Sequence, residues 1–354
     1  MKIGIVGGPY AGKTILFQAL AAEEGEGIKT EAVNKGFSLA TVKVPDERLD
    51  YLTTFYPRSK IVRAEVCFID IPRPGKERTG GGWETETLTH IRNMDALISV
   101  LRAFENPRVP LDTEGLNPLR DLKELEAEFQ FIDLIIVEKR LERLKKENAK
   151  GSEVQSIEKA LELLNQGISL RLGKWNPEEA KVLTGYAFLS MKPLLVVLNV
   201  SEDGYSEEEV AALKDWIQSQ GLCYLQVCCQ LERELAGLSP DEQEEFMQEW
   251  GVQELARPRL IESSYQLLDL ISFLTFGDKE ARAWPIPRGT TATQAAGKIH
   301  SDIERGFIRA EVIHHDQLKE TGSPAEARKR GFYRLEGKDY VVQDGDVITF
   351  RFNV

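Results

Sequence analysis

The stretch KIGIVGGPYAGKTILFQAL, residues 2–20, constrains the fold of this chain more than any other segment. An apolar run from Ile3 to Val6 has the composition of a strand and ends at two glycines, and the residues from Lys13 onward follow helical spacing. Between them stands the phosphate-loop pattern G-x-x-x-x-G-K-[ST], here Gly7 to Thr14. The alternative is a chance glycine-rich turn before a helix. The complete pattern between a strand and a helix instead predicts a P-loop nucleotide-binding domain.

The residue types of this loop carry a specific chemistry. Backbone N–H groups can point at a phosphate only where side chains do not intrude, and the helix N-terminus adds partial positive charge. Lys13 is predicted to reach the β and γ phosphates as the catalytic cation, and the hydroxyl of Thr14 to bind Mg²⁺. We therefore expect Mg²⁺ and a nucleoside triphosphate as ligands. The predicted nucleotide contacts of the loop are Gly8, Pro9, Tyr10, Ala11, Gly12, Lys13, Thr14 and Ile15.

Two further residues are candidates for the metal site. Thr41 follows the first helix in the region where P-loop switch proteins place a threonine that meets Mg²⁺; an ordinary strand threonine is the alternative. Asp70 ends a second apolar run, at the place where a Walker-B aspartate holds Mg²⁺ through a water; a turn cap is the alternative. The predicted metal residues are thus Thr14, Thr41 and Asp70.

The segment after Asp70 departs from the usual GTPase pattern. GTPases continue D-x-x-G, whose glycine N–H binds the γ-phosphate, but here Asp70-Ile71-Pro72-Arg73 puts an arginine at that position. Prolines remove backbone donors, and no glutamine follows that would orient a water. The sequence therefore predicts altered sensing of the γ-phosphate and no Ras-like catalytic glutamine.

The rest of the first 280 residues alternates strands and helices around one interruption. Buried strands are expected at 96–101 and 194–198, and the helices between strands predict parallel β-α-β units with the nucleotide at the carboxyl edge of the sheet. Apolar residues at spacings of three and four begin at Leu122 and resume at 154–168 after the polar break Lys150-Gly151-Ser152. This pattern predicts an inserted, antiparallel helical hairpin.

The base-binding side of the site follows the strand at 194–198. GTPases place N-K-x-D there, and this chain has Asn199-Val200-Ser201-Glu202. Valine cannot pack over the base as lysine does, and the carboxylate of Glu202 is one methylene longer than that of aspartate, so guanine preference is weakened. A later strand ends where the base-contacting loop of such domains lies. The predicted base-side residues are Asn199, Val200, Glu202, Cys228 and Cys229.

Charge separates the two ends of the chain. The net charge of −12 argues against a protein that coats nucleic acid with its whole surface. From Ala281 onward, however, twelve Lys or Arg face ten Asp or Glu, a balance of about +2 that permits an RNA- or ribosome-facing surface. Short alternating stretches there, with a hairpin signal at Asp344-Gly345, predict a small β-grasp module.

Membrane and export signals are not apparent in the sequence. No run approaches the roughly 18 apolar residues of a membrane span, and the chain enters the phosphate-loop strand without a charged leader and apolar segment. We therefore expect a cytoplasmic protein with no membrane partner.

Together these features resemble the YchF/Obg-like ATPase family of P-loop NTPases. The similarity runs through GGPYAGKT, LATVKVPDERLD, FIDI, IRNMDALISVLRAFENP, MKPLLVVLNVSEDG and DEQEEFMQEWG. It is most specific in RAWPIPRGTTATQAAGKIHSDIERGFIRAEVI and GKDYVVQDGDVITFRFNV, which resemble the TGS domain of that family nearly residue for residue. Two departures stand out: Tyr10 replaces the usual phosphate-loop asparagine, and the family's D-I-A-G becomes Asp70-Ile71-Pro72-Arg73.

The resemblance implies an α/β fold with three parts: a Ras-like P-loop domain (1–117 and 180–275), an inserted helical coiled-coil hairpin (118–179) and a C-terminal β-grasp TGS domain (276–354). It implies ATP in preference to GTP, because the family's base motif N-x-x-E is matched by Asn199 and Glu202. It also implies a ribosomal partner, in particular the large subunit, or RNA, reached through the TGS and helical domains.

Three functions are therefore carried forward from the sequence. The first is a slow, Mg²⁺-dependent ATPase that regulates a ribosomal or translational partner. The second is an interaction module that holds nucleotide without hydrolysing it, which the altered D-x-x-G region favours. The third is an ordinary GTPase switch.

Overall fold

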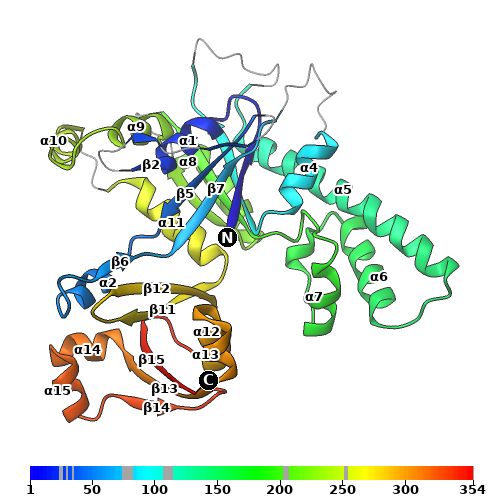
Figure 1. Ribbon diagram of the computed structural model, residues 1–354. Coiled ribbons are helices and arrows are strands. Elements are labelled where there is room, and N and C mark those ends of the chain that lie inside the picture. The colour runs from blue at the N-terminus through cyan, green and yellow to red at the C-terminus, as the bar shows by residue number, and fades with distance from the viewer. Residues whose placement is uncertain are drawn as a thin grey trace. The chain divides into compact units, whose positions relative to one another are not determined.

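The computed structural model describes residues 1–23, 27–28, 31–33, 36–73, 83–106, 115–201, 207–250 and 254–353. The chain forms two compact units, whose elements are labelled in Figure 1. The first, here called the nucleotide unit, comprises Met1–Val42 and Cys67–Leu260. The second, the C-terminal unit, comprises Lys43–Val66 and Ile261–Val354.

The nucleotide unit is built on a mostly parallel sheet. Its described strands run in the order β10-β9-β8-β1-β7-β5-β4, and β1 pairs in parallel with both β7 and β8. Every residue of β8 and β9 is buried, as expected for parallel strands that are covered on both faces. The strands are β1 (Lys2–Gly7), β4 (Glu31–Val33), β5 (Phe37–Lys43), β7 (Glu65–Asp70), β8 (Ala96–Ala103), β9 (Leu194–Val200) and β10 (Cys223–Val227), with a separate pair β2 (Ala22–Glu23) and β3 (Gly27–Ile28).

Helices connect these strands and supply the cover that a parallel sheet needs. The α1 helix begins directly after the phosphate loop and buries Leu16, Phe17 and Leu20. The strands predicted at 96–101 and 194–198 are confirmed as β8 and β9, and with them the α/β fold. The helices are α1 (Lys13–Ala21), α4 (Thr85–Arg92), α8 (Glu207–Ser219), α9 (Cys229–Leu235), α10 (Pro240–Trp250) and the start of α11 (Ala256–Leu267), which belongs to the C-terminal unit from Ile261 onward.

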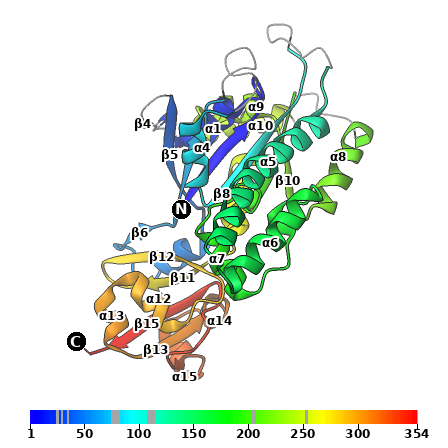
Figure 2. The ribbon, with the colours of Figure 1, turned by 90° about the vertical axis from the view of Figure 1, so that its right-hand side faces the viewer.

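The helical hairpin interrupts the nucleotide unit between β8 and β9. Figure 2 shows its two long helices, α5 (Pro118–Lys146) and α6 (Ser152–Asn165), side by side. They are followed by η1 (Leu170–Leu172) and α7 (Pro177–Thr184). Leu125 and Phe129 in the first half of α5 pack into the core of the sheet, whereas Val137 and Leu141 pack with α6. Because half of α5 is embedded in the sheet core, the hairpin forms one compact unit with the sheet.

The C-terminal unit contains a mixed sheet of order β14-β13-β15-β11-β12-β6 among the described residues. β15 pairs antiparallel with β13 and parallel with β11, and α12 packs Ala295 and Ala296 onto a core that includes Phe273 and Val312. The predicted β-grasp TGS fold is confirmed. Its elements are β11 (Leu270–Phe276), β12 (Glu280–Pro287), α12 (Ala292–Ile299), α13 (Ser301–Arg305), β13 (Phe307–His314), α14 (His315–Thr321), α15 (Pro324–Lys329), β14 (Arg334–Glu336) and β15 (Asp346–Phe352).

The division of the chain differs from the predicted boundaries because an early segment joins the C-terminal sheet. The segment 43–66 carries α2 (Glu47–Thr53) and β6 (Lys60–Val62), and β6 pairs in parallel with β12. The C-terminal unit also begins before 276, since the whole of β11 lies in its sheet. Strand pairing between segments more than 200 residues apart leaves no local signal in the sequence.

The hairpin predicted at Asp344-Gly345 is wrong, although the turn itself exists. Gly345 has a left-handed backbone (φ 81°), but β15 after it pairs with β13 and β11. The Asp344 carboxylate accepts the N–H of Ser272 at 2.8 Å, which fixes the turn to β11 instead.

No helix within the described residues is long and apolar enough to cross a bilayer.

Candidate nucleotide-binding site

The phosphate loop joins β1 to α1 and has Gly7 and Gly12 at its two ends. A Cβ on Gly7 (φ 145°) would lie 2.3 Å from the carbonyl oxygen of Val100, and one on Gly12 (φ 95°) would lie 2.2 Å from Nδ2 of Asn199. Tyr10 also has a positive φ of 60°, and its side chain is 61% exposed. Glycine is therefore required at both ends of the loop by space and by backbone angle, and the loop presents backbone groups to a ligand.

Lys13, the first residue of α1, holds its ammonium group over the loop. Its Nζ donates to the carbonyl oxygens of Gly7 at 3.1 Å and Gly8 at 2.8 Å. Burial lowers the pKa of Lys13 to about 8, an effect that the charge of Asp70 opposes and that of Arg73 reinforces. The ammonium group of Lys13 is thus poorly solvated, and an anion bound at the loop would stabilise its charged form.

Thr14 and Asp70 form the metal side of the site. The Thr14 hydroxyl donates to Oδ2 of Asp70 at 2.7 Å, across 56 residues of sequence. The other oxygen, Oδ1, is buried and has no hydrogen-bond partner among the described residues. Burial raises the pKa of Asp70, while the bond from Thr14 and the charge of Lys13 lower it. A buried carboxylate oxygen without a partner is what a hard cation satisfies.

These two residues fit Mg²⁺ bound to a triphosphate. Mg²⁺ takes oxygen ligands and usually needs only one or two protein groups beside phosphates and waters. A hydroxyl and a carboxylate at one end of the phosphate loop supply that number. The described residues contain no group of three or more His, Cys, Asp or Glu that could hold a metal without a phosphate.

Asn199, at the end of β9, connects the phosphate loop to the base side. Its Nδ2 donates to the carbonyl oxygen of Ala11 at 3.0 Å, and its Oδ1 accepts the N–H of Cys229 at 3.1 Å. The side chain is only 3% exposed, so both bonds lie out of water. The predicted residue is therefore at the site, where it braces two backbone segments against each other.

The remaining base-side candidates are placed as follows. Val200 is buried at the end of β9, and Cys228 caps the start of α9. Cys229 is fully buried, burial raises the pKa of its thiol, and its N–H is already bonded to Asn199. Glu202 lies outside the described residues. In the loop, Ala11 is buried, Pro9 is exposed, and Gly8 and Ile15 are half-buried.

The third predicted metal residue is Thr41. It is exposed on β5, which neighbours β7 in the sheet. Just beyond β5, Val44 donates to Ala64 at 2.8 Å, immediately before β7 begins, whereas Asp70 is the last residue of β7. This bond places the end of β5 beside the start of β7. The role of Thr41 as a metal ligand stays a prediction.

One cluster near the site was not found from the sequence. Arg73 Nη2 contacts both carboxylate oxygens of Glu128 on α5, at 2.6 and 2.8 Å. Trp83 Nε1 donates to Oε2 of the same carboxylate at 3.0 Å, and the guanidinium carbon lies 4.9 Å from the centre of the Trp83 ring. Glu128 is one of many acids on a charged helix, so no spacing rule singled it out.

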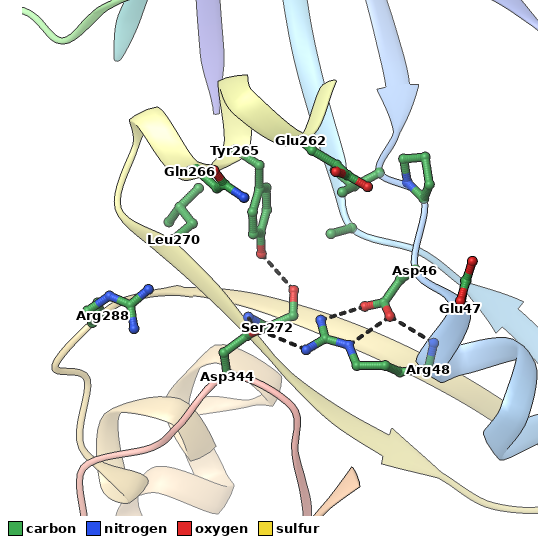
Figure 3. Close-up of a pocket in the computed structure, with 13 residues that line it drawn as sticks. Asp46, Glu47, Arg48, Glu262, Tyr265, Gln266, Leu270, Ser272, Arg288 and Asp344 are labelled. Atoms are coloured by element: carbon green, nitrogen blue, oxygen red, sulfur yellow. Dashed lines mark hydrogen bonds and ion pairs between the residues drawn. The ribbon is translucent and has the colours of Figure 1, made fainter. Parts of the chain in front are cut away.

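A separate cavity of about 420 Å³ lies within the C-terminal unit (Figure 3). Arg48 fills one side of it, bonded to Asp46 at 2.8 Å and to Asp344 at 2.9 Å, and Tyr265 contacts Ser272 at 2.7 Å. Burial alone would lower the pKa of Arg48, but its bonds to the two carboxylates outweigh burial and raise that pKa. None of the phosphate-loop residues lines this cavity.

Comparisons with known proteins show relatives along the full length of the chain. A family model named YchF-GTPase_C, described as "Protein of unknown function (DUF933)", matches residues 270–353. The chain is 38% identical to a "Ribosome-binding ATPase YchF" of Pasteurella multocida, over 100% of this chain and 99% of that protein. It is 37% identical to the Bacillus subtilis protein of the same name, over 100% of both.

Solved structures show the same fold. The structure of the YchF GTPase of Schizosaccharomyces pombe superposes with a TM-score of 0.87 and 29% identity, covering 99% of this chain and 97% of that one. Similarity therefore extends over the full length, the fold is shared, and the phosphate loop is complete. The chain is a P-loop NTPase that belongs to the YchF/Obg-like ATPase family.

Proposed function

We propose that this protein is a Mg²⁺-dependent ATPase with slow turnover that acts on the ribosome. The observation that carries the proposal is the cluster of Lys13, Thr14 and Asp70, in which a desolvated ammonium group lies over the phosphate loop and a buried carboxylate oxygen lacks a partner among the described residues. A triphosphate with its metal would satisfy both groups at once.

The chain's own residues supply binding and orientation of the phosphates. Lys13 would exchange the carbonyl oxygens of Gly7 and Gly8 for phosphate oxygens, and the backbone N–H groups of the loop would donate to the same anion. Thr14 and Asp70 would hold Mg²⁺, Asp70 through a water. Bound there, the metal would supply neutralisation of charge on the β and γ phosphate oxygens.

Hydrolysis can be tested at Lys13. We expect Lys13→Ala to lower Mg²⁺-dependent release of phosphate from ATP by at least about 100-fold, the cost of losing one positioned cation at the transferred group. Lys13→Arg, which keeps the charge with a different shape, should retain part of the activity. Equal rates for wild type and Lys13→Ala would refute the assignment.

The preference for ATP over GTP rests on the base side. Val200 stands where guanine-specific domains have a lysine, and its side chain is 6% exposed and so offers little surface to a base. The carboxylate of Glu202 is longer than the aspartate that pairs with guanine. We expect ATP to displace a fluorescent nucleotide analogue at lower concentration than GTP does. At least tenfold tighter binding of GTP would favour a GTPase instead, the activity for which the Schizosaccharomyces pombe relative is named.

A non-hydrolysing nucleotide-binding module is the second candidate. The pairing of Arg73 with Glu128 favours it, because the arginine stands where GTPases use a glycine N–H and is engaged elsewhere. Single-turnover release of phosphate separates the two functions. Turnover in wild type above that of Lys13→Ala would exclude the module.

The ribosomal partner is supported by the names of the Pasteurella multocida and Bacillus subtilis relatives and by one face of the C-terminal sheet. Arg309 on β13 stands opposite Arg351 on β15, so both side chains lie on one face together with Glu311, two residues along. Arg351 and Arg328 both contact Glu311, at 3.0 and 3.3 Å, and are 57% and 58% exposed. Three arginines around one carboxylate suit a phosphate backbone.

This surface can be tested by charge reversal. We expect Arg309→Glu combined with Arg351→Glu to reduce co-sedimentation with ribosomes and its dependence on salt, while leaving ATP affinity unchanged. Arg288→Glu, an exposed arginine paired with Asp269, is the matched control. Unchanged ribosome binding in the double variant would remove this face from the proposal. The helical hairpin, with exposed Phe131 and Ile135 on α5, would be tested next. A ribosomal partner also implies the cytoplasm as the working compartment.

A further inference from the structure

Arg73 occupies the sequence position, just after β7, at which P-loop switch proteins have the glycine that senses the γ-phosphate. It follows Asp70 by three residues, and Ile71 between them is fixed to β1 by a bond from its N–H to the carbonyl oxygen of Ile5 at 3.2 Å. Three residues span at most about 10 Å, so the backbone of Arg73 stays close to the carboxyl end of β7, where Asp70 meets Thr14. A side chain here can reach the phosphate end of the site.

The contacts of Arg73 direct its charge toward the hairpin. Its side chain is 14% exposed and bonds to both oxygens of Glu128, while Trp83 supports the pair by bonding to Glu128 and by facing the guanidinium. Glu128 is next to Phe129, which is 1% exposed in the sheet core, so the position of this carboxylate is fixed on α5. The arginine is therefore held by a rigid anion from the helical insertion.

The charge of Arg73 also acts electrostatically on Lys13 at the phosphate loop. It contributes to lowering the pKa of Lys13, in addition to the larger effect of burial, which places the two cations within electrostatic range of each other. A γ-phosphate in contact with Lys13 would attract the same guanidinium. Two anions, one from α5 and one from the nucleotide, would then compete for one arginine.

Building on the proposed ATPase function, we propose that Arg73 is a catalytic arginine shared between Glu128 of α5 and the γ-phosphate of bound triphosphate. With triphosphate bound, the guanidinium turns from Glu128 to the γ-phosphate oxygens. There it stabilises the charge of the transferred group while a water oxygen bonds to the γ-phosphorus, the bond to the β–γ bridging oxygen breaks with its electron pair leaving on ADP, and the water gives up a proton to solvent.

The exchange couples the nucleotide to the hairpin in both directions. When the triphosphate binds Arg73, Glu128 keeps its hydrogen bond from Trp83 but loses its ion pair with Arg73. The attachment of residues 71–73 to α5 is then weaker. By linkage, a partner that binds better when the bond between Arg73 and Glu128 is broken raises the affinity for the triphosphate, and the triphosphate raises the affinity for that partner by the same factor. Affinity for ADP is unaffected, because ADP has no γ-phosphate.

The test uses the full-length protein and four variants: Arg73→Ala, Arg73→Lys, Glu128→Gln and, as an exposed glutamate of α5, the control Glu142→Gln. We measure single-turnover hydrolysis of ATP and, separately, the affinities for ADP and for a non-hydrolysable ATP analogue. Arg73→Ala should lower the hydrolysis rate at least tenfold and weaken the analogue but not ADP, and Arg73→Lys should restore part of both. Glu128→Gln should tighten binding of the analogue several-fold, and Glu142→Gln should leave it unchanged.

The outcomes separate this inference from the function on which it rests. If Arg73→Ala and Glu128→Gln change neither hydrolysis nor the ratio of analogue to ADP affinity while Lys13→Ala is inactive, Arg73 is a structural brace and the inference fails alone. If wild type shows no turnover above Lys13→Ala, the ATPase function fails, and the catalytic role of Arg73 with it. Melting temperatures identify variants that have lost the fold, and Arg73→Lys then replaces Arg73→Ala in the comparison.

Discussion

Removal of the Asn199 side chain tests whether the site is held together by this one buried amide. Asn199→Ala deletes the donor to the carbonyl oxygen of Ala11 at 3.0 Å and the acceptor for the N–H of Cys229 at 3.1 Å. Both bonds belong to a side chain that is 3% exposed, so water cannot easily replace them. An unsatisfied buried backbone group costs about 1–3 kcal/mol, and two such groups make a loss of about 2–6 kcal/mol for the nucleotide unit.

The expected change in melting temperature follows from this loss. A domain of roughly 150–250 residues loses about 2–4 °C per kcal/mol, which predicts a decrease of about 4–24 °C in the melting temperature followed by circular dichroism. Asn199→Asp should be at least as damaging at pH 7, since it keeps the acceptor for Cys229 but sets a buried carboxylate against the carbonyl oxygen of Ala11. ATP affinity should fall in both variants, because the loop loses its brace.

The control is Asn93→Ala, at an exposed asparagine after α4, which should lie within about 0.5 kcal/mol of wild type. If Asn199→Ala is as stable as Asn93→Ala and binds ATP normally, the brace contributes nothing and the geometric argument is refuted.

Three other perturbations address the phosphate loop. Gly12→Ala would place a Cβ 2.2 Å from Asn199 at a φ of 95°, so it should abolish nucleotide binding and lower the melting temperature. Gly8→Ala, whose Cβ would have nothing within 4 Å, should leave the melting temperature unchanged. Equal melting temperatures for the two variants would contradict the packing argument. The pKa of Lys13 is about 8, so ATP affinity should weaken as pH rises above 8, by up to about tenfold per unit, and calorimetry should show no such loss in Lys13→Arg. Asp70→Asn should raise the melting temperature of the ligand-free protein, because burial raises the pKa of Asp70 and its charge therefore costs stability above that pKa. The same variant should lose the stabilisation that Mg²⁺ and ATP give to wild type. A lower melting temperature without ligand would be inconsistent with this reading.

Those parts of the molecule that depend on neighbouring residues were predictable from the sequence. The phosphate loop, α1, β8 and β9 are each encoded in fewer than about twenty consecutive residues by apolar period and glycine placement. Asn199 was found because it matches the first residue of the N-K-x-D motif at the end of a predicted strand, and parallel strands present their carboxyl ends at one edge.

What the sequence did not reveal depends on pairing between distant segments. The strand β6 joins β12 across more than 200 residues. The turn at Asp344-Gly345 was predicted by its residue types, yet the partner of β15 is chosen by the whole sheet. The contact between Arg73 and Glu128 likewise spans 55 residues, and only the fold shows that these two charges meet.

The most direct test of the central claim is a crystal structure of the protein with Mg²⁺ and a non-hydrolysable ATP analogue. We expect the phosphates to lie in the loop from Gly7 to Thr14, with Lys13 on the β and γ phosphates and the Thr14 hydroxyl turned from Asp70 to the metal. A nucleotide bound elsewhere, or a loop that excludes phosphate while Thr14 stays bonded to Asp70, would contradict the account.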